Sequence, residues 1–365
     1  MKVLVSGGGT GGHIYPAIAI AKKIMEKRPD AELLYVGTAR GMEADIVPKE
    51  NINFKSIRVK GFRRKLSVDT AKTAVELCKG MNDARRIVKE FKPDIVIGTG
   101  GYVCGPVLMV AALKGIPTLI HEQNAFPGAT NRILSKFVDK VACGFEETER
   151  FIKAKKKLVY TGNPVRAEFK DIDRNSVRAE LKCEDKKVIL AFGGSGGQRS
   201  INDAMMKLMK DYADREDIQI YHVTGKRFSE SFNEKLTEEN IVPGDNVKIM
   251  EYCYNLPQYI AASDIIVTSA GAITIAEITA LGISSILVPK RYTTENHQEY
   301  NARALEKKGA AKVILEKDLD ETDFTEVMNS VIDDEKMLES MRENSRKMGT
   351  TEAAEKIYEV VDKLI

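Results

Sequence analysis

Short runs of aliphatic and β-branched residues alternate along the chain with longer stretches in which apolar residues recur at helical spacing. In the first half the expected strands are Val3–Ser6, Leu33–Val36, Asp94–Gly98, Thr118–His121 and Val138–Ala142, and the main helical patterns are Ile14–Lys27, Val68–Glu90 and Cys104–Leu113. In the second half the expected strands are Val188–Phe192, Ile218–Val223, Val247–Met250, Ile265–Thr268, Ser285–Val288 and Ala311–Ile314. This alternation predicts parallel sheets covered by helices on both faces.

The two halves of the chain begin with the same pattern. KVLVSGGGTGGH at residues 2–13 aligns without a gap with KVILAFGGSGGQ at residues 187–198, so each half opens with a strand, a glycine turn and a helix start. A repeat of this size indicates two domains of the same construction. A helix start leaves backbone N–H groups unpaired and glycines let a phosphate approach them, with Thr10 and Ser195 as additional hydroxyl donors. Two such turns in register favour anion binding over tight turns without a ligand.

Chain-breaking residues separate the two halves. The run TGNPVR at residues 161–166 is followed by a highly charged stretch, so we place the first domain at residues 1–162 and the second at residues 163–344. The helical tail either caps the second domain or returns to the first as a helix at about 345–365. We predict an α/β protein of two Rossmann-like, doubly wound domains facing across a cleft, with ligands beyond the carboxyl ends of the strands.

Composition narrows the class of protein. The 365 residues are 43% apolar and 30% charged with a formal net charge of +3, which is typical of a soluble globular protein and argues against a general nucleic-acid binder. The five cysteines include no CxxC pair, so neither a disulfide framework nor a zinc site is indicated, and a reducing cytoplasm fits best. The first strand begins almost at Met1, so we expect no signal peptide, and no apolar run reaches the ~18 residues of a spanning helix.

Polar residues of the first half stand where parallel strands end. His13 follows the first glycine turn, where the helix dipole disfavours the imidazolium ion and suits histidine as a general base; a histidine that only caps the turn is the alternative. The run His121–Asn124 follows a buried strand and is more typical of a binding loop than of a solvated turn. Ala125 stands where the zinc motif HExxH needs its second histidine.

Other patterns are weaker. The first turn matches the spacing GxGxxG, but the second strand ends at Tyr35–Thr38 without the carboxylate of a dinucleotide site. Glu277 lies about one turn into a helix that follows Gly271, where a carboxylate either accepts hydrogen bonds from a vicinal diol such as a ribose or only stabilises the helix dipole. The DxD pairs at residues 171–173 and 318–320 lie in charged, linker-like sequence, so no metal site is predicted.

A basic and partly apolar stretch at residues 61–66 precedes the longest helical pattern. Together with Leu77, Met81, Lys136 and Lys140 it predicts either a surface for anionic lipid or an ordinary solvated loop and helix face. The residues by themselves favour the solvated loop.

Six motifs, in order along the chain, resemble the MurG family of peptidoglycan glycosyltransferases: GGGTGGHIYPAIAIA at 7–21, GTGGYVCGP at 98–106, HEQNAFPGATN at 121–131, GNPVR at 162–166, GGSGGQRSIN at 193–202 and SAGAITIAE at 269–277. The resemblance runs from Met1 to about Gly309. It implies the GT-B fold, with the donor on the C-terminal domain and the acceptor on the N-terminal one. The implied reaction moves N-acetylglucosamine, with inversion, from UDP-N-acetylglucosamine (UDP-GlcNAc) to the 4-hydroxyl of N-acetylmuramoyl-(pentapeptide)-pyrophosphoryl-undecaprenol (lipid I), giving lipid II.

The resemblance also implies roles for individual residues. On the donor side it implies that Gly194, Ser195 and Gly196 hold the diphosphate with Arg166 nearby, that Glu277 binds the ribose, that Ala272, Ile273, Thr274 and Gln298 contact the sugar or diphosphate, and that the backbone near Cys253 faces uracil. On the acceptor side it implies His13 as the base, with Thr10, Gly11, Gly12, Tyr102, Glu122 and Asn124 lining the site. Two departures affect donor contacts: Ser269 stands where many relatives have arginine, and His297 where some have a second glutamine.

The implied chemistry needs no cofactor, since a helix terminus and Arg166 offset the charge of the departing UDP, and no divalent cation is expected to be essential. A lipid acceptor implies a peripheral protein on the cytoplasmic face of the cell membrane, in contact with anionic lipid of the inner leaflet and with other cell-wall synthesis proteins. This strengthens the lipid interpretation of residues 61–66. Two alternatives remain: an isomerase like UDP-GlcNAc 2-epimerase, which needs no lipid acceptor, and a sugar-nucleotide-binding scaffold without chemistry.

Overall fold

The computed structural model describes residues 1–59, 68–194 and 196–365, with residues 68–74 described by their backbone. The chain forms two compact units: unit 1 comprises Met1–Val165 and Glu352–Ile365, and unit 2 comprises Arg166–Thr351. The division between them lies inside the chain-breaking run at residues 161–166, slightly beyond the boundary that we placed after residue 162. Ser195 and the basic stretch at residues 61–66 lie outside the described residues.

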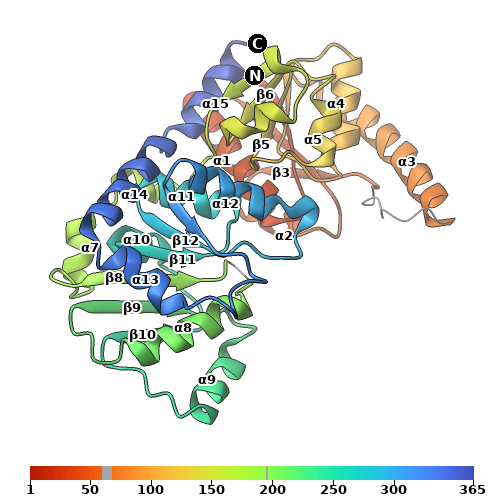
Figure 1. The fold of residues 1–365 in the computed structure, drawn as a ribbon. Coiled ribbons are helices and arrows are strands. Elements are labelled where there is room, and N and C mark those ends of the chain that lie inside the picture. Colours follow the sequence, from red (N-terminus) through yellow and green to blue (C-terminus); the bar gives the residue numbers. More distant parts are fainter. Residues whose placement is uncertain (60–67, 195) are drawn as a thin grey trace. The chain divides into compact units, whose positions relative to one another are not determined.

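The described part of unit 1 contains a parallel sheet of seven strands in the order β3-β2-β1-β4-β5-β6-β7. Strands β3, β5 and β6 of this sheet are labelled in Figure 1. Its strands are β1 (Lys2–Ser6), β2 (Glu32–Gly37), β3 (Asn53–Ser56), β4 (Ile95–Gly98), β5 (Thr118–Glu122), β6 (Lys140–Cys143) and β7 (Leu158–Tyr160). Its helices are α1 (Gly11–Lys27), α2 (Glu43–Lys49), α3 (Val68–Phe91), α4 (Cys104–Leu113), α5 (Ala129–Leu134), α15 (Ala353–Asp362) and the short 3-10 turns η1 (Glu146–Arg150) and η2 (Lys155–Lys157).

Both faces of this sheet are buried under helices. Because successive side chains of a strand point to opposite faces, Val3 and Val5 of β1 pack with α1, α2 and α15, whereas Leu4 packs with α3, α4 and α5. The sequence pattern missed β3 and β7. Both lie at the edges of the sheet and are short, and β3 is largely polar and exposed, so neither carries the apolar run of a central strand.

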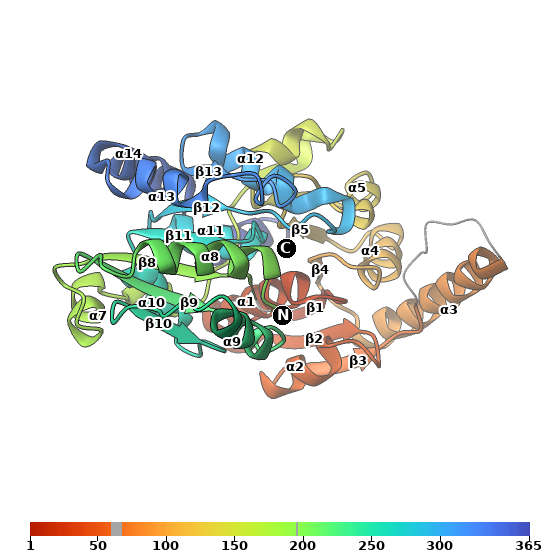
Figure 2. The ribbon, with the colours of Figure 1, turned by 60° about the horizontal axis from the view of Figure 1, so that its bottom comes forward.

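The described part of unit 2 contains a parallel sheet of six strands in the order β10-β9-β8-β11-β12-β13. Its strands are β8 (Lys187–Phe192), β9 (Ile218–Val223), β10 (Val247–Met250), β11 (Ile265–Thr268), β12 (Ser284–Leu287) and β13 (Ala311–Val313). Its helices are α6 (Glu168–Asp171), α7 (Arg174–Glu180), α8 (Arg199–Asp211), α9 (Ser229–Glu238), α10 (Leu256–Ala262), α11 (Ala272–Ala280), α12 (His297–Lys307), α13 (Phe324–Ile332), α14 (Glu335–Met348) and the 3-10 turn η3 (Thr294–Asn296). One face packs under α8, α9, α13 and α14, and α8 is seen against it in Figure 2.

The internal repeat is confirmed by the topology. β1 pairs with β2 on one side and β4 on the other, and β8 pairs in the same way with β9 and β11. In each sheet the strand order reverses at this central strand, and ligands of doubly wound sheets bind at such a reversal, beyond the carboxyl ends of the strands. Both glycine turns follow directly from these central strands, so the predicted fold class of two doubly wound α/β domains is confirmed.

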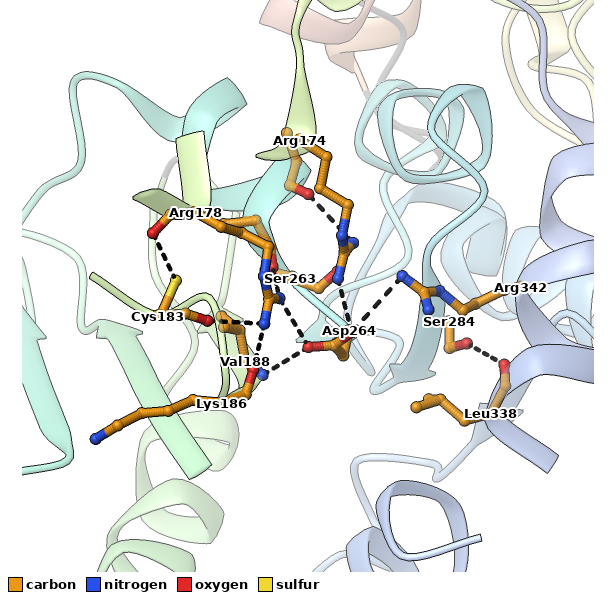
Figure 3. Close-up of polar contacts among 12 residues, drawn as sticks. Arg174, Arg178, Cys183, Lys186, Val188, Ser263, Asp264, Ser284, Leu338 and Arg342 are labelled. Carbon is orange, nitrogen blue, oxygen red and sulfur yellow. Dashed lines mark hydrogen bonds and ion pairs between the residues drawn. The ribbon is translucent and has the colours of Figure 1, made fainter. Parts of the chain in front are cut away.

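At the amino-terminal ends of the central strands of unit 2, away from the second glycine turn, Asp264 forms ion pairs with three arginines (Figure 3). Arg174 and Arg178, both on α7, lie 2.7 and 3.1 Å from its carboxylate oxygens, and Arg342 of α14 lies 3.6 Å away. The carboxylate also accepts the N–H of Val188 at the start of β8, at 2.8 Å. This network ties α7, a seven-residue helix near the start of unit 2, to two central strands and to α14.

The C-terminal tail serves both units. α14 belongs to unit 2, where Leu338 and Met341 join the core, whereas α15 belongs to unit 1, where Ile357 and Val361 are fully buried. The helix expected at about 345–365 is therefore two helices, which separate at Gly349–Glu352. In the described part of the chain, none of the helices combines the length and the apolar character that crossing a membrane requires.

Candidate active site

The first glycine turn positions His13 through the backbone. Nδ1 of His13 lies 3.0 Å from the carbonyl oxygen of Gly8, so Nδ1 carries the proton and donates it, which leaves Nε2 as the basic nitrogen. The hydroxyl of Thr10 lies 3.3 Å from the same Nδ1. Burial lowers the pKa of His13, and the charge of Glu122, the Gly8 carbonyl and the charge of Glu43 partly offset this effect. The ring is therefore a neutral base near pH 7.

The loop after β4 packs tightly against this turn. Gly100 and Gly101 both have positive φ, and a Cβ atom at Gly101 would lie 2.3 Å from the Gly8 carbonyl oxygen. A Cβ atom at Gly100 would lie 2.9 Å from Nε2 of His13, so glycine is required for the ring to occupy its place. Tyr102 lies beside Gly9, with its ring 3.5 Å from the position of a Cβ atom there. The structure thus brings Tyr102 together with the first turn.

Glu122 at the end of β5 is buried, and its carboxylate organises the loop that follows. Oε1 accepts the backbone N–H of Asn124 at 2.9 Å and the side-chain amide at 3.2 Å, and Oε2 accepts the N–H of Gly128 at 3.0 Å and the Asn131 amide at 2.9 Å. Both oxygens of Glu122 therefore bond to the loop, and the role of Glu122 on the acceptor side stays a prediction. Asn124 is half-buried, whereas the other three residues of His121–Asn124 are buried.

His121, on the same strand, is a core residue. It is fully buried, its Nε2 donates to the carbonyl of Gly162 at 3.1 Å, and its Nδ1 accepts from the Gln123 amide at 3.1 Å. Burial lowers the pKa of His121 to about 4, so this imidazole stays neutral. Gln123 also donates to the carbonyl of Thr99 at 2.9 Å and thereby links β5 to the loop after β4.

The second glycine turn has the geometry expected of a phosphate-binding turn. Gly194 and Gly197 have positive φ, and α8 starts two residues later at Arg199. Gly196 is exposed, and among the described residues other than its chain neighbours no atom would lie within 4 Å of a Cβ atom built there. The hydroxyl of Ser269, after β11, lies 3.2 Å from the position of a Cβ atom at Gly194, so the ends of β8 and β11 meet at this turn.

Arg166 and Glu277, for which the sequence analysis predicted separate roles in donor binding, form an ion pair within unit 2. Nε of Arg166 donates to Oε1 of Glu277 at 2.8 Å, and the guanidinium lies 5.3 Å from the ring centre of Phe169. The Glu277 side chain is only 8% exposed and the Arg166 side chain 42% exposed. Burial raises the pKa of Glu277, and the charge and hydrogen bond of Arg166 partly offset this increase.

Gln298 ties together two strand ends of the unit 2 sheet. Its Oε1 accepts the N–H of Ala270 at 3.2 Å and the N–H of Lys290 at 2.9 Å. α11 starts at Ala272 after Gly271, so Ala272, Ile273 and Thr274 form its first turn, where backbone N–H groups lack helical partners. Cys253 is half-buried after β10, between the exposed Tyr254 and Tyr252, whose rings pack edge to face at 4.8 Å.

Sequence reasoning missed three charged residues at these turns. Glu43 of α2 is fully buried beneath the first turn. Lys290, after β12, donates to the carbonyl of Gly197 at 2.9 Å, and burial lowers its pKa. Glu316 accepts from Gln198 at 3.1 Å, from Ser200 at 2.7 Å and from the N–H of Arg291 at 2.7 Å. None of the three lies in one of the two glycine turns. In the sequence each is only a charged residue that follows a predicted strand, which does not single it out.

Two family models match the chain. The model described as "Glycosyltransferase family 28 N-terminal domain" matches residues 3–143, and "Glycosyltransferase family 28 C-terminal domain" matches residues 188–357. The two ranges contain both glycine turns and all the candidate residues except Arg166, which lies between them.

Full-length relatives share one name. The chain is 51% identical over 362 residues to the UDP-N-acetylglucosamine–N-acetylmuramyl-(pentapeptide) pyrophosphoryl-undecaprenol N-acetylglucosamine transferase of Thermoanaerobacter sp. (strain X514), with 99% of each chain covered. It is 49% identical over 367 residues to the protein of that name from Clostridioides difficile (strain 630), which covers 100% of this chain and 89% of the relative.

Solved structures with the same fold include that of Acinetobacter baumannii MurG, with a TM-score of 0.79 at 26% identity over 99% of both chains. The UDP-GlcNAc 2-epimerase from Neisseria meningitidis, bound to UDP-GlcNAc, has a TM-score of 0.69 at 17% identity over 100% of both chains. At that identity the likeness to the epimerase shows a common fold alone.

Proposed function

Because the chain belongs to glycosyltransferase family 28 and, within it, to the MurG family of peptidoglycan N-acetylglucosamine transferases, we propose that it transfers N-acetylglucosamine from UDP-GlcNAc to the 4-hydroxyl of the N-acetylmuramoyl group of lipid I, giving lipid II. The observation that carries this proposal is the 51% identity to a transferase of that name across 99% of both chains.

In this proposal unit 2 binds the donor. The diphosphate lies at the second turn, at Gly194, Ser195 and Gly196, where backbone N–H groups and the start of α8 favour an anion. Glu277 accepts the ribose hydroxyls, and the ion pair with Arg166 favours the charged form of its buried carboxylate against the effect of burial. Thr274 and the first turn of α11, with Gln298, contact the diphosphate or the sugar, and the backbone near Cys253 faces the uracil.

Unit 1 supplies the base. Nε2 of His13 accepts the proton of the 4-hydroxyl as that oxygen bonds to C1 of N-acetylglucosamine, and the bond from C1 to the diphosphate oxygen breaks with its electron pair on UDP. A single displacement of this kind inverts the anomeric centre. Thr10, Gly11, Gly12, Tyr102 and Asn124 line the acceptor side, and Glu122 acts by holding the loop that carries Asn124.

The charge of the departing UDP is offset by the start of α8, by Arg166 and by Lys290 beside the second glycine turn. We therefore propose that no cofactor or divalent cation is essential. EDTA treatment followed by an activity assay tests this point. Retention of full activity is expected, and loss that Mg²⁺ restores would contradict it.

We further propose peripheral attachment to anionic lipid of the inner leaflet of the cell membrane, where lipid I and other cell-wall synthesis proteins are met. Unit 1 exposes Leu113 at the end of α4, Ile133 on α5 and Phe137 just after it. Nζ of Lys157 donates to the carbonyls of Lys136 and Val138 and so brings a cation beside Phe137. Apolar side chains flanked by lysines are typical of lipid-binding surfaces. Met81 instead packs partly against the core.

The test uses purified protein, UDP-GlcNAc labelled in the sugar and a lipid I analogue with a shortened polyprenyl chain, with an otherwise identical reaction that lacks the acceptor. Label in the lipid-linked product only when acceptor is present is expected. Epimerised sugar or free UDP without acceptor would instead support the isomerase, and bound UDP without any turnover would support the scaffold. The epimerase alternative has the shared fold as its only support.

A further inference from the structure

Glu43 is a buried carboxylate that the reaction described above does not use. Its side chain is fully inaccessible, and none of the ion pairs among the described residues includes it. Oε1 accepts the backbone N–H of Thr38 at 3.0 Å and the Thr38 hydroxyl at 2.7 Å, and Oε2 accepts the N–H of Gly9 at 3.2 Å. A carboxylate buried without a cation costs free energy unless its oxygens are hydrogen-bonded, and here three donors satisfy them.

Three glycines leave the space that this carboxylate fills. A Cβ atom at Gly8 would lie 2.6 Å from Oε1 of Glu43, one at Gly41 would lie 2.3 Å from both carboxylate oxygens, and one at Gly37 would lie 2.5 Å from Cγ. Real Cβ atoms do not approach other atoms so closely. The backbone of two segments, the first glycine turn and the connection from β2 to α2, is therefore shaped around the Glu43 side chain.

The equivalent place in unit 2 has a different occupant. In the gapless alignment of the two turns, Gly193 and Gly194 correspond to Gly8 and Gly9. A Cβ atom at Gly193 would lie closest to atoms of Gly197 and Gln198, and one at Gly194 would lie 3.2 Å from the hydroxyl of Ser269. Glu316 bonds to Gln198 and Ser200 just after the second turn. No carboxylate is among the described atoms nearest to Gly193 and Gly194, so the carboxylate of Glu43 against the Gly8–Gly9 peptide distinguishes the first turn. This carboxylate places negative charge at a backbone N–H that a phosphate would otherwise use.

One peptide group connects Glu43 to His13. The peptide between Gly8 and Gly9 donates its N–H to Oε2 of Glu43, and its carbonyl oxygen accepts Nδ1–H of His13 at 3.0 Å. Gly101 packs against the same carbonyl and restricts its movement. Hydrogen bonds arranged in such a chain polarise one another in a low dielectric, so a negative charge at one end strengthens the acceptor at the other.

We propose that Glu43 is a positioning residue for His13, and that it acts through the Gly8–Gly9 peptide to hold the imidazole in the tautomer with a free Nε2. This is the role that a carboxylate has when it bonds directly to a catalytic histidine, here carried across one amide. In this proposal the first glycine turn positions the catalytic base, whereas the second glycine turn binds the diphosphate. The importance of this tautomer for transfer rests on the proposed function.

Other groups of unit 1 also face His13. Glu122 of β5 and Glu43 of α2 both oppose the effect of burial on the pKa of His13. Tyr35 of β2, whose hydroxyl donates to the carbonyl of Gly7, and Cys104 of α4 have raised pKa values because they are buried, that of Cys104 to about 11, so both are uncharged near neutral pH. Removal of the Glu43 charge should therefore lower the pKa of His13 further, because only Glu122 and the Gly8 carbonyl would then oppose the effect of burial.

The test compares E43Q, E43D and the surface control D45N on the same helix, in protein labelled with ¹⁵N-histidine. In the wild type and in D45N the ring nitrogens of His13, assigned with H13A, should report the Nδ1–H tautomer. E43Q keeps the size of the side chain but presents an amide –NH₂ to one of the donors, and E43D keeps the charge but is one methylene too short to reach Gly9. In both variants the Nδ1–H tautomer should lose population.

Transfer kinetics supply the second measurement. In E43Q the acidic limb of the pH profile of kcat/KM should move toward lower pH by about half a unit or more. Both variants should lose kcat/KM by about tenfold or more, because misplacement of a base costs rate steeply. The affinity for UDP should stay unchanged, since Glu43 lies in the other unit.

A purely structural role predicts a different result, namely lower thermal stability with a wild-type tautomer and a wild-type pH profile, and this result would overturn the proposal. If E43Q does not fold, T38V removes one of the three donors to Glu43 and should give a smaller loss of the tautomer; no change would again contradict the coupling. The nuclear magnetic resonance measurement needs no substrate. A wild type that shows the coupling but transfers no sugar would therefore refute the proposed function and leave this inference standing.

Discussion

Arg166 and Glu277 are 111 positions apart, and Nε of the arginine lies 2.8 Å from a carboxylate oxygen of the glutamate. Arg166 is the first residue of unit 2, and Glu277 stands in the middle of α11. The ion pair joins the start of this unit to one of its central helices. It also provides the charge that a buried carboxylate needs to accept hydrogen bonds from a diol while ionised.

Replacement of this carboxylate should weaken donor binding. We expect E277Q to lower the affinity for UDP-GlcNAc by about ten- to a hundredfold, because two hydrogen bonds to a charged acceptor become weaker and Arg166 loses its partner. Isothermal titration calorimetry measures the effect, and E306Q on the surface of α12 is the matched control. Unchanged affinity in E277Q would remove Glu277 from the donor site.

Donor affinity should also depend on pH through Glu277. Because burial raises the pKa of this side chain, acidification protonates it, and UDP affinity should fall at a pH above the ordinary value of 4.5. Arg166 opposes this shift, so in R166M the pKa rises further and the loss should begin at a higher pH than in the wild type. Titrations with UDP from pH 4.5 to 8 test both statements, and a wild-type pH profile in R166M would contradict the second.

His13 should be needed for chemistry and not for donor binding. We expect H13A to lower kcat by about 10² to 10⁴-fold, the usual contribution of a positioned general base, with the Kd of UDP unchanged. Steady-state transfer to the lipid I analogue and UDP titration make the two measurements. Normal transfer by H13A would show that another group takes the proton.

Lys290 is expected to hold the second glycine turn. K290M removes the bond from Nζ to the carbonyl of Gly197 and a half-buried cation beside the turn, so UDP affinity should fall by about three- to tenfold. Uridine, which lacks the diphosphate, should bind equally to the wild type and to K290M. An equal loss of affinity for uridine would indicate a general disturbance of unit 2. The variant K307M, on the surface of α12, controls for the change in net charge.

The Asp264 network should stabilise unit 2. D264N removes the charge that three arginines share and should destabilise the unit by about 3–5 kcal/mol, because breaking a buried ion cluster leaves its partners uncompensated. Hydrogen exchange of β8 and β11 measures the local free energy of opening. D203N, which breaks an exposed ion pair with Lys235, should change this free energy of opening by less than about 1 kcal/mol. Equal protection in D264N and the wild type would refute the stabilising role.

Much of the fold follows from local pattern. Apolar runs of strand length, helical spacing and two glycine turns in register predicted both parallel sheets, their central strands and the position of His13 after β1, because each depends on a few consecutive residues. The edge strands β3 and β7 were missed for different reasons: β3 is largely polar and exposed, and β7 is apolar but only three residues long, so pairing with a neighbouring strand defines both.

The amino-acid sequence by itself therefore determined the class of fold, the repeat and the chemistry-bearing motifs of this protein. The tertiary structure alone decided which distant residues meet: Arg166 with Glu277, Lys290 with the second turn, α15 with unit 1, and Glu43 beneath the peptide that holds His13. The physical reason is that burial and hydrogen bonding act between neighbours in space. A charged residue such as Glu43 carries no mark of burial in its own sequence window until three glycines and the Thr38 backbone enclose it.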